Sequence, residues 1–210
     1  MRALIYKDFL GVKKILIFLY LLTTVLGIYF IKMDRFSILL MYFVIIPIRL
    51  ISALFEIDNN YLVDRYLIAS GFSRRKIVIS RYVFLWLITL VSLLISLALI
   101  FFLKVKIENL GLVLFISILI VASEFISLIE IPLMYKLGAN RTKQLTSISY
   151  LLGFAIFILV GKNKENLGRF LLGNLSFSEN TLAFAIVIFI ILLNLVSLLV
   201  SFKIFDNKEV

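Results

Sequence analysis

Long, continuously apolar segments alternate with short charged segments along the 210-residue chain. A helix needs about 20 apolar residues to cross the roughly 30 Å of bilayer hydrocarbon. Backbone groups inside lipid must bond to one another, and runs that are uniformly apolar favour helices over a barrel. The pattern predicts an all-α integral membrane protein with six transmembrane helices, at residues 15–31, 36–55, 83–103, 110–135, 145–160 and 182–202.

The fifth of these runs is the shortest. As a helix, residues 145–160 would extend about 24 Å at roughly 1.5 Å per residue, which is short for a complete crossing. A charged segment and a short apolar stretch, FLLGNLSF, follow it. We therefore expect an outer re-entrant or interfacial segment at residues 161–180.

The first fourteen residues carry an amphipathic pattern of their own. One helical sector collects the apolar side chains Met1, Ile5, Phe9 and Val12. The basic side chains lie mostly away from this sector, although Asp8 falls near it. An interfacial elbow helix at residues 1–14 fits this pattern. The alternative is a charged flank of the first span.

Composition narrows the function classes. The chain is 63% hydrophobic and has neither histidine nor cysteine, so thiolate nucleophiles, imidazole bases, disulfides and histidine metal ligands are excluded. Intramembrane metalloproteases and rhomboid-type serine proteases need histidine and are excluded with them. We expect no catalytic residue and no metal site.

The net charge of +10 arises beside the spans rather than in one basic stripe, so we expect no nucleic-acid partner. With six spans and a cytoplasmic N-terminus, fourteen of the 22 lysines and arginines lie on the inside: Arg2, Lys7, Lys13, Lys14, Arg65, Arg74, Arg75, Lys76, Arg81, Lys136, Arg141, Lys143, Lys203 and Lys208. Seven lie outside: Lys32, Arg35, Lys104, Lys106, Lys162, Lys164 and Arg169. This asymmetry predicts that both termini are cytoplasmic.

The predicted cytoplasmic loop at residues 56–82 carries two sets of helix boundary signals. Asn59 or Asn60 can cap a short helix that ends at Ser70 before Gly71, and Ser73 can cap a long helix that continues into the third span. The loop either only orients the protein or docks a cytoplasmic partner.

The loop sequence YLVDRYLIASGFSRRKIVISRY, residues 61–82, resembles the cytoplasmic loop of small ABC-2 type transporter permeases. That family has an aspartate and an aromatic residue, a helix-breaking turn and a Ser-Arg-Lys cluster. The departure is Gly71, where proline is usual. The residues that the resemblance assigns to coupling with an ATPase are Tyr61, Asp64, Arg65, Tyr66, Gly71, Ser73, Arg74, Arg75 and Lys76.

Two further stretches are similar to the same family. They are IPLMYKLG, residues 131–138, and the opening MRALIYKDF, so the resemblance covers the full length. It implies an ABC-2 (type V) exporter-like fold in a bacterial plasma membrane, in which two permeases, identical or paralogous, pair above two cytoplasmic ATPases. The segment from Asn60 to Ser70 would be the coupling helix. Permease subunits of bacterial peptide exporters, such as the phenol-soluble modulin exporter, are similar in size, which implies export of amphipathic, antimicrobial or cytolytic peptides.

This chain does not carry the ATPase itself. A P-loop needs G-x-x-x-x-G-K-S/T, but the single Gly-Lys pair, Gly161 and Lys162, has Ile156 in place of the first glycine and Asn163 in place of the hydroxyl residue. The resemblance therefore implies no cofactor in this chain, and ATP and Mg on the partner ATPase.

Three charged residues lie within predicted spans: Arg49, Glu124 and Glu130. Arg49 and Glu130 are at similar depths from the cytoplasmic ends of their spans, which predicts an ion pair with either a packing or a transport role. Pro47 and Pro132 lie two residues from these charges and favour bent helices. Glu124 would face the partner permease or the transport path, or pack as a neutral acid.

Thr89, Ser92 and Ser96 form a stripe on the third span. Small polar residues of this kind favour close helix packing over substrate selection.

A second function class stays open from the sequence. The chain could be a proton-coupled carrier or a bacteriocin-immunity factor without an ATPase, with Arg49, Glu124 and Glu130 as its relay.

Overall fold

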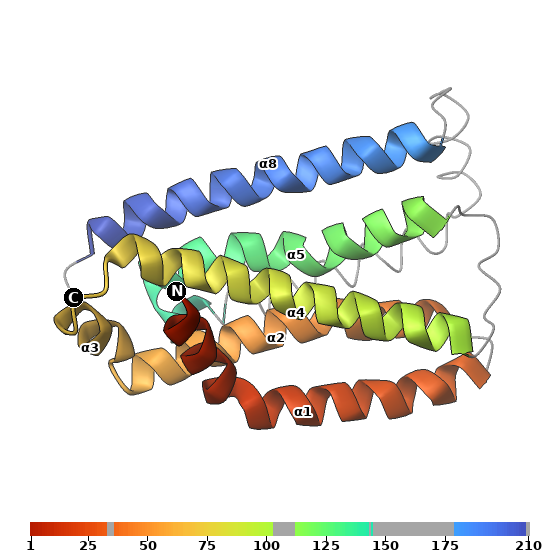
Figure 1. The fold of residues 1–210 in the computed structure, drawn as a ribbon, viewed down its shortest axis with the longest axis horizontal. Helices are drawn as coiled ribbons and strands as arrows, with labels where there is room; N and C mark the ends of the chain where they lie inside the picture. Colours follow the sequence, from red (N-terminus) through yellow and green to blue (C-terminus); the bar gives the residue numbers. More distant parts are fainter. Residues whose placement is uncertain (33–35, 103–111, 143, 145–178, 209–210) are drawn as a thin grey trace.

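The structure is a computed structural model that describes residues 1–32, 36–102, 112–142, 144 and 179–208. Every element in these ranges is a helix: α1 Arg2–Lys32, α2 Phe36–Asn60, α3 Val63–Ala69, α4 Arg74–Phe102, α5 Leu112–Leu137 and α8 Glu179–Asp206. The long helices run side by side along the long axis, and the short α3 lies at one end (Figure 1). The all-helical class predicted from the sequence is confirmed for this part of the chain.

Three of the described helices are long and apolar enough to cross a membrane, over Arg2–Tyr29, Arg74–Leu99 and Ala183–Asp206. Their outward faces are apolar, as Val25, Phe101 and Leu199 show with exposed fractions of 65%, 81% and 64%. Side chains of this kind are covered by lipid in a membrane protein. The chain is therefore a multi-pass membrane protein.

The helices α2 and α5 cover the second and fourth predicted spans, and each contains its proline, Pro47 or Pro132. The fifth predicted span and residues 161–178 lie outside the described residues. The total of six spans stays a prediction.

The N-terminal segment is part of one continuous helix, α1, rather than a separate element. Its first turns are inclined to the rest of α1 (Figure 1). The side chains that pack inward are Leu4, Asp8 and Val12, whereas Met1 and Phe9 of the predicted apolar sector are 44% and 40% exposed. An apolar outer edge of this kind is compatible with the predicted interfacial position.

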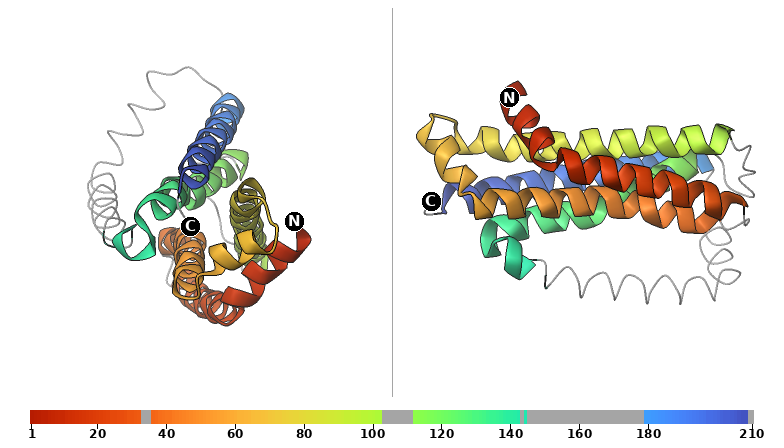
Figure 2. Two further views of the ribbon diagram at one scale, coloured as in Figure 1. Left: turned by 90° about the vertical axis from the view of Figure 1, so that its left-hand side faces the viewer. Right: turned by 90° about the horizontal axis from the view of Figure 1, so that it is seen from below.

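Among the side chains that the structure describes, a tightly packed core lies in the half of the bundle nearer to α3. Ile51 and Leu54 of α2, Leu85 of α4 and Ile131 of α5 are at most 1% exposed there. The N-terminal turns of α1 and the C-terminal end of α8 lie toward this same end (Figure 2).

Candidate functional site

The short helix α3 joins α2 to α4 through tight turns. The helix α2 continues to Asn60, and α3 begins at Val63 after Leu62, whose φ is +52° and which makes no side-chain capping bond. The expected cap at Asn59 or Asn60 is therefore wrong. Both asparagines belong to the last turn of α2, so the turn between the two helices falls at Tyr61 and Leu62.

The C-terminal end of α3 matches the prediction. Gly71 has a φ of +86°, and its N–H donates to the carbonyl of Ile68 at 3.0 Å. The N–H of Phe72 donates to the carbonyl of Leu67, also at 3.0 Å. These two bonds form a Schellman motif, in which a left-handed residue ends the helix. The helix α4 then begins at Arg74, directly after Ser73.

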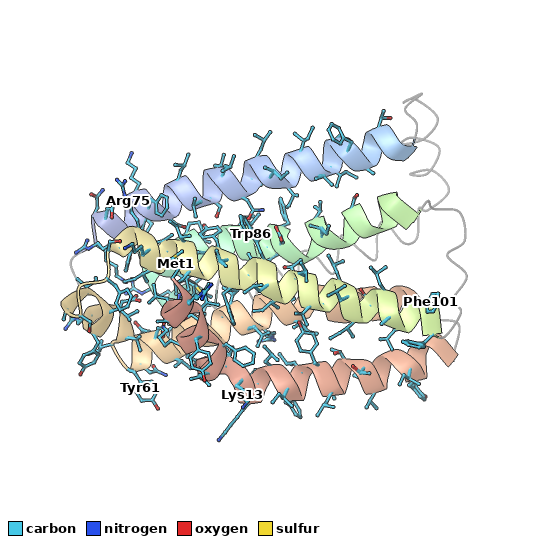
Figure 3. All side chains as sticks on the ribbon, in the orientation of Figure 1. Met1, Lys13, Tyr61, Arg75, Trp86 and Phe101 are labelled. Atoms are coloured by element: carbon cyan, nitrogen blue, oxygen red, sulfur yellow. The ribbon has the colours of Figure 1, made fainter. Side chains whose placement is uncertain are left out.

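One face of α3 packs inward and the other is exposed. Leu67 and Ile68 pack against the core. The outward residues, which we name the α3 surface, are Tyr61, Leu62, Arg65 and Tyr66. Both tyrosines are 70% exposed. Figure 3 shows Tyr61 projecting from the end of the bundle where Arg75 also lies, opposite Phe101.

Asp64 is half-buried in the first turn of α3. Burial raises the pKa of the Asp64 carboxyl, and the positive charges of Lys208 and Lys7 partly oppose that shift. Lys7 belongs to α1, and Lys208 follows α8.

A group of four charged side chains lies inside the bundle near α3. We name this group, made up of Lys7, Asp8, Asp58 and Arg81, the buried charge cluster. Asp8 is fully buried, Arg81 is 1% exposed and Asp58 is 5% exposed. The cluster contains two cations and two carboxylates, so its formal charges balance.

Arg81 of α4 lies between the two carboxylates. Its Nη1 atom is 2.6 Å from Oδ1 of Asp8 on α1, and its Nη2 contacts Oδ2 of Asp58 on α2. The guanidinium also lies over the Phe55 ring, 5.5 Å from the ring centroid. A guanidinium with several donors suits this bridging position better than a lysine would.

Lys7 closes the cluster on the solvent side. Its Nζ lies 2.9 Å from Oδ1 of Asp8, and 3.1 and 3.2 Å from the two carboxylate oxygens of Asp58. The cluster thus connects α1, α2 and α4. The helices on either side of α3 in the chain are α2 and α4. Both are attached to α1 by buried charges.

Arg74 connects the start of α4 to the end of α8. Its Nη1 donates to the carbonyl oxygens of Phe205, Asp206 and Lys208, at 3.0, 2.6 and 2.9 Å. Arginine suits this position because carbonyls at a helix C-terminus lack partners within the helix. The neighbouring Arg75 is 73% exposed and lies 3.7 Å from a carboxylate oxygen of Asp206.

The described ion pairs do not include the expected one between Arg49 and Glu130. Glu130 is 1% exposed, and its Oε1 accepts a hydrogen bond of 2.6 Å from Ser52. Arg49 is exposed. The buried Ser52, three residues along the same helix, is the α2 side chain that meets Glu130 of α5.

Glu124 belongs to a different set of contacts. It is 6% exposed and accepts a hydrogen bond of 2.9 Å from the side chain of Asn194 on α8. The carbonyl oxygen of the Asn194 side chain accepts a bond of 2.8 Å from the indole of Trp86 on α4. Glu124 and Glu130 therefore have different partners, and the described contacts do not join them with Arg49 into one relay.

The predicted polar stripe on α4 faces the protein. Thr89, Ser92 and Ser96 are each at most 3% exposed. The Ser92 hydroxyl bonds to the Tyr20 hydroxyl of α1 at 2.8 Å, and Ser96 donates to its own helix at Leu93. These contacts favour a role of the stripe in close helix packing rather than in substrate selection.

Comparison with known families decides the identity of this helical membrane protein. The model of a family described as ABC-2 family transporter protein matches residues 3–206. The chain belongs to the ABC-2 transporter permeases. No curated protein and no solved structure matches it. Family membership makes this permease a membrane subunit that works with an ABC ATPase and is not itself the ATPase.

The buried charge cluster of this permease is a feature that the sequence did not predict. One signal was present, because Asp8 fell near an otherwise apolar sector of the first helix. The predicted cytoplasmic loop at residues 56–82 included Asp58 and Arg81, so nothing in the pattern marked them as buried. Only the helical extensions of α2 and α4 place them inside the bundle.

Proposed function

We propose that this permease is the membrane half of an ATP-driven exporter and that α3 is its coupling helix. The observation that carries the proposal is the two-faced packing of α3. Leu67 and Ile68 attach it to the core, while Tyr61, Arg65 and Tyr66 face outward at the end of the bundle. Exposed tyrosines beside an arginine are typical of protein interfaces.

The buried charge cluster supports a mechanical connection between α3 and the helices in the membrane. A force on α3 acts on both α2 and α4, because the short helix is attached to them by tight turns. Arg81 and Asp58 join those two helices, and Asp8 adds α1. The three helices would then move together between inward-facing and outward-facing packings when the ATPases close.

The assembly in this proposal contains two permeases, identical or paralogous, and two ATPases that carry ATP and Mg. Both termini are cytoplasmic, which agrees with the position of the first turns of α1 and the end of α8 beside α3. The membrane is a bacterial plasma membrane. The substrate is an amphipathic peptide of the antimicrobial or cytolytic kind, for which the support is the small size of the permease.

Co-purification with the ATPase tests the docking assignment. A double variant, Arg65→Glu with Tyr66→Ala, changes only exposed side chains and should lose the ATPase from a pull-down in detergent. Phe101→Ala is the matched control, because Phe101 is 81% exposed at the other end of the bundle. Retention of the ATPase by a double variant with an unchanged melting temperature contradicts the coupling-helix assignment.

The substrate assignment has its own experiment. ATP hydrolysis by the purified complex in bilayers is measured with an amphipathic cytolytic peptide and with a scrambled peptide of equal composition. The amphipathic peptide should stimulate hydrolysis, whereas the scrambled one should not. Equal rates with both peptides contradict peptide export and leave the docking result unaffected.

A further inference from the structure

An open apolar groove of about 750 Å³ lies between the N-terminal half of α1 and the middle of α4. Its walls include Ile5, Phe9, Leu16 and Tyr20 of α1, and Leu87 and Val91 of α4. Arg2, in the first turn of α1, is also among the lining residues. The groove is separate from the α3 surface and from the buried charge cluster.

The groove opens toward the bilayer. Neighbouring side chains on the same two helices, Phe18, Leu21 and Leu90, are 64%, 63% and 54% exposed and are of the kind that lipid covers. Along α1 the lining extends from Arg2 to Tyr20, which is the part of Arg2–Lys32 nearer to the N-terminus. The groove therefore lies in one leaflet, where its apolar walls match an acyl chain.

Arg2 is the one charged residue among the described residues that line the groove. Arg2 is exposed there, and the residues that line the groove include no aspartate or glutamate. The nearest acid in the first turns of α1, Asp8, points into the bundle and is paired with Arg81 and Lys7. The positive charge of Arg2 is thus available to a phosphate group at the membrane surface.

We propose that this groove is a binding site for an anionic phospholipid, with one acyl chain along Leu16 and Val91 and the phosphate at Arg2. The site fixes a lipid where the inclined first turns of α1 meet α4. The proposed ligand is a lipid of the surrounding bilayer rather than the exported substrate. The lipid proposal can therefore be correct or wrong independently of the ATPase assignment.

A fluorescence experiment tests the site, because the chain has a single tryptophan, Trp86. Trp86→Phe removes it, and Val91→Trp then places a reporter on the groove wall. The protein is reconstituted in phosphatidylcholine bilayers with a small fraction of brominated phosphatidylglycerol or brominated phosphatidylcholine. We expect the anionic lipid to be enriched about fivefold over its bulk fraction at the reporter, the factor that one basic residue supplies near an anionic lipid.

Two further variants localise the effect. Arg2→Gln should make quenching by the two brominated lipids equal. A control reporter, Leu195→Trp on the lipid-facing side of α8, where Leu195 is 52% exposed, should show equal quenching throughout. Native mass spectrometry of the protein with Trp86 intact, with and without Arg2→Gln, repeats the comparison without the tryptophan changes and should show retained phosphatidylglycerol only when Arg2 is present.

Three results overturn the proposal. Equal quenching by both lipids at Val91→Trp would mean that the groove contains ordinary bilayer lipid without headgroup preference. No quenching by either lipid means that something else, such as a second copy of the chain, fills the groove. A preference for phosphatidylglycerol that persists in Arg2→Gln places the phosphate elsewhere.

Discussion

Nη1 of Arg81 and Oδ1 of Asp8 lie 2.6 Å apart in an almost fully buried contact between α4 and α1. The two residues are far apart in the sequence, and each lies within a predominantly apolar helix. Asp58 and Lys7 complete a balanced set of charges around them. Buried charges are costly unless each has a partner, so this contact ties the position of α1 to that of α4.

Charge balance in the cluster leads to a first prediction. Arg81→Gln leaves two buried carboxylates with only Lys7, so we expect it to destabilise the protein by about 3–5 kcal/mol. Asp8→Asn alone should also destabilise, because it leaves two cations with one carboxylate. The double variant Asp8→Asn with Arg81→Gln restores neutrality and should be more stable than Arg81→Gln, as measured by thermal unfolding in detergent.

Arg75→Gln is the matched control for Arg81→Gln. Arg75 is also on α4, but its ion pair with Asp206 is exposed, so the substitution should cost no more than about 1 kcal/mol. Equal losses of stability for Arg75→Gln and Arg81→Gln would show that the cluster is not a special source of stability.

A second prediction concerns Glu130. Its contact with Ser52 predicts that Ser52→Ala and Glu130→Gln are energetically coupled, with an interaction free energy between about 0.5 and 3 kcal/mol in a double-mutant cycle. Arg49→Met combined with Glu130→Gln should instead be additive, because Arg49 is exposed whereas Glu130 is buried. Thermal unfolding of the unsubstituted protein and of these single and double variants measures both cycles. Coupling to Arg49 without coupling to Ser52 would refute the described contact.

The turn after α3 yields a third prediction. The φ of Gly71 is +86°, and a Cβ at this position would have no heavy atom within 4 Å, so only backbone strain opposes a side chain there. Gly71→Ala should cost about 1 kcal/mol, and Gly71→Asn should cost less. Gly71→Pro should be the worst, because proline requires a negative φ and removes the N–H that bonds to Ile68.

Melting temperature and ATPase co-purification measure these three variants. Because the φ of Gly71 is positive, proline cannot occupy position 71 without a change in this turn. A proline variant as stable as Gly71→Asn would contradict the left-handed conformation at position 71.

The carboxyl of Asp64 provides a pH prediction. Its pKa is raised by burial in the folded protein, so the protonated form is favoured by folding. The contribution of this group to stability is fully present below its unfolded pKa of about 3.9 and is lost as pH rises through the higher folded pKa. Asp64→Asn should therefore raise the melting temperature at pH 7 and change it little near pH 4.

Melting curves of the Asp64→Asn variant and the unsubstituted protein across pH 4 to 7 measure this effect. A variant that is less stable at pH 7 would mean that the attraction of Lys7 and Lys208 outweighs the burial of Asp64.

The last prediction concerns Arg74. Arg74→Gln removes donors from the carbonyls at the end of α8, so the segment from Phe205 to Lys208 should exchange its amide hydrogens faster and become more sensitive to carboxypeptidase. Arg75→Gln, one residue along, should leave both properties nearly unchanged. Docking experiments on α3 should accordingly use Arg75 rather than Arg74, since charge reversal at Arg74 disturbs the fold as well as the surface.

The sequence alone determined the features that depend on local composition. Apolar runs of membrane length predicted the long helices, and Gly71 and Ser73 marked the turn between α3 and α4, because hydrophobic burial and backbone conformation act within a few residues. The family followed from short motifs spread along the chain. The location of the candidate coupling helix followed from the same motifs.

Tertiary structure decided which charges meet. The pairing of Arg81 with Asp8 and Asp58 depends on how three helices pack, and no local pattern specifies that arrangement. The choice of Ser52 rather than Arg49 as the neighbour of Glu130 depends on the rotational phase of α2 against α5. Depth along a helix can be counted from the sequence, but the direction of a side chain around the helix has meaning only once its neighbour is in place. For this reason Arg49 and Glu130 lie at similar depths, yet the described partner of Glu130 is Ser52.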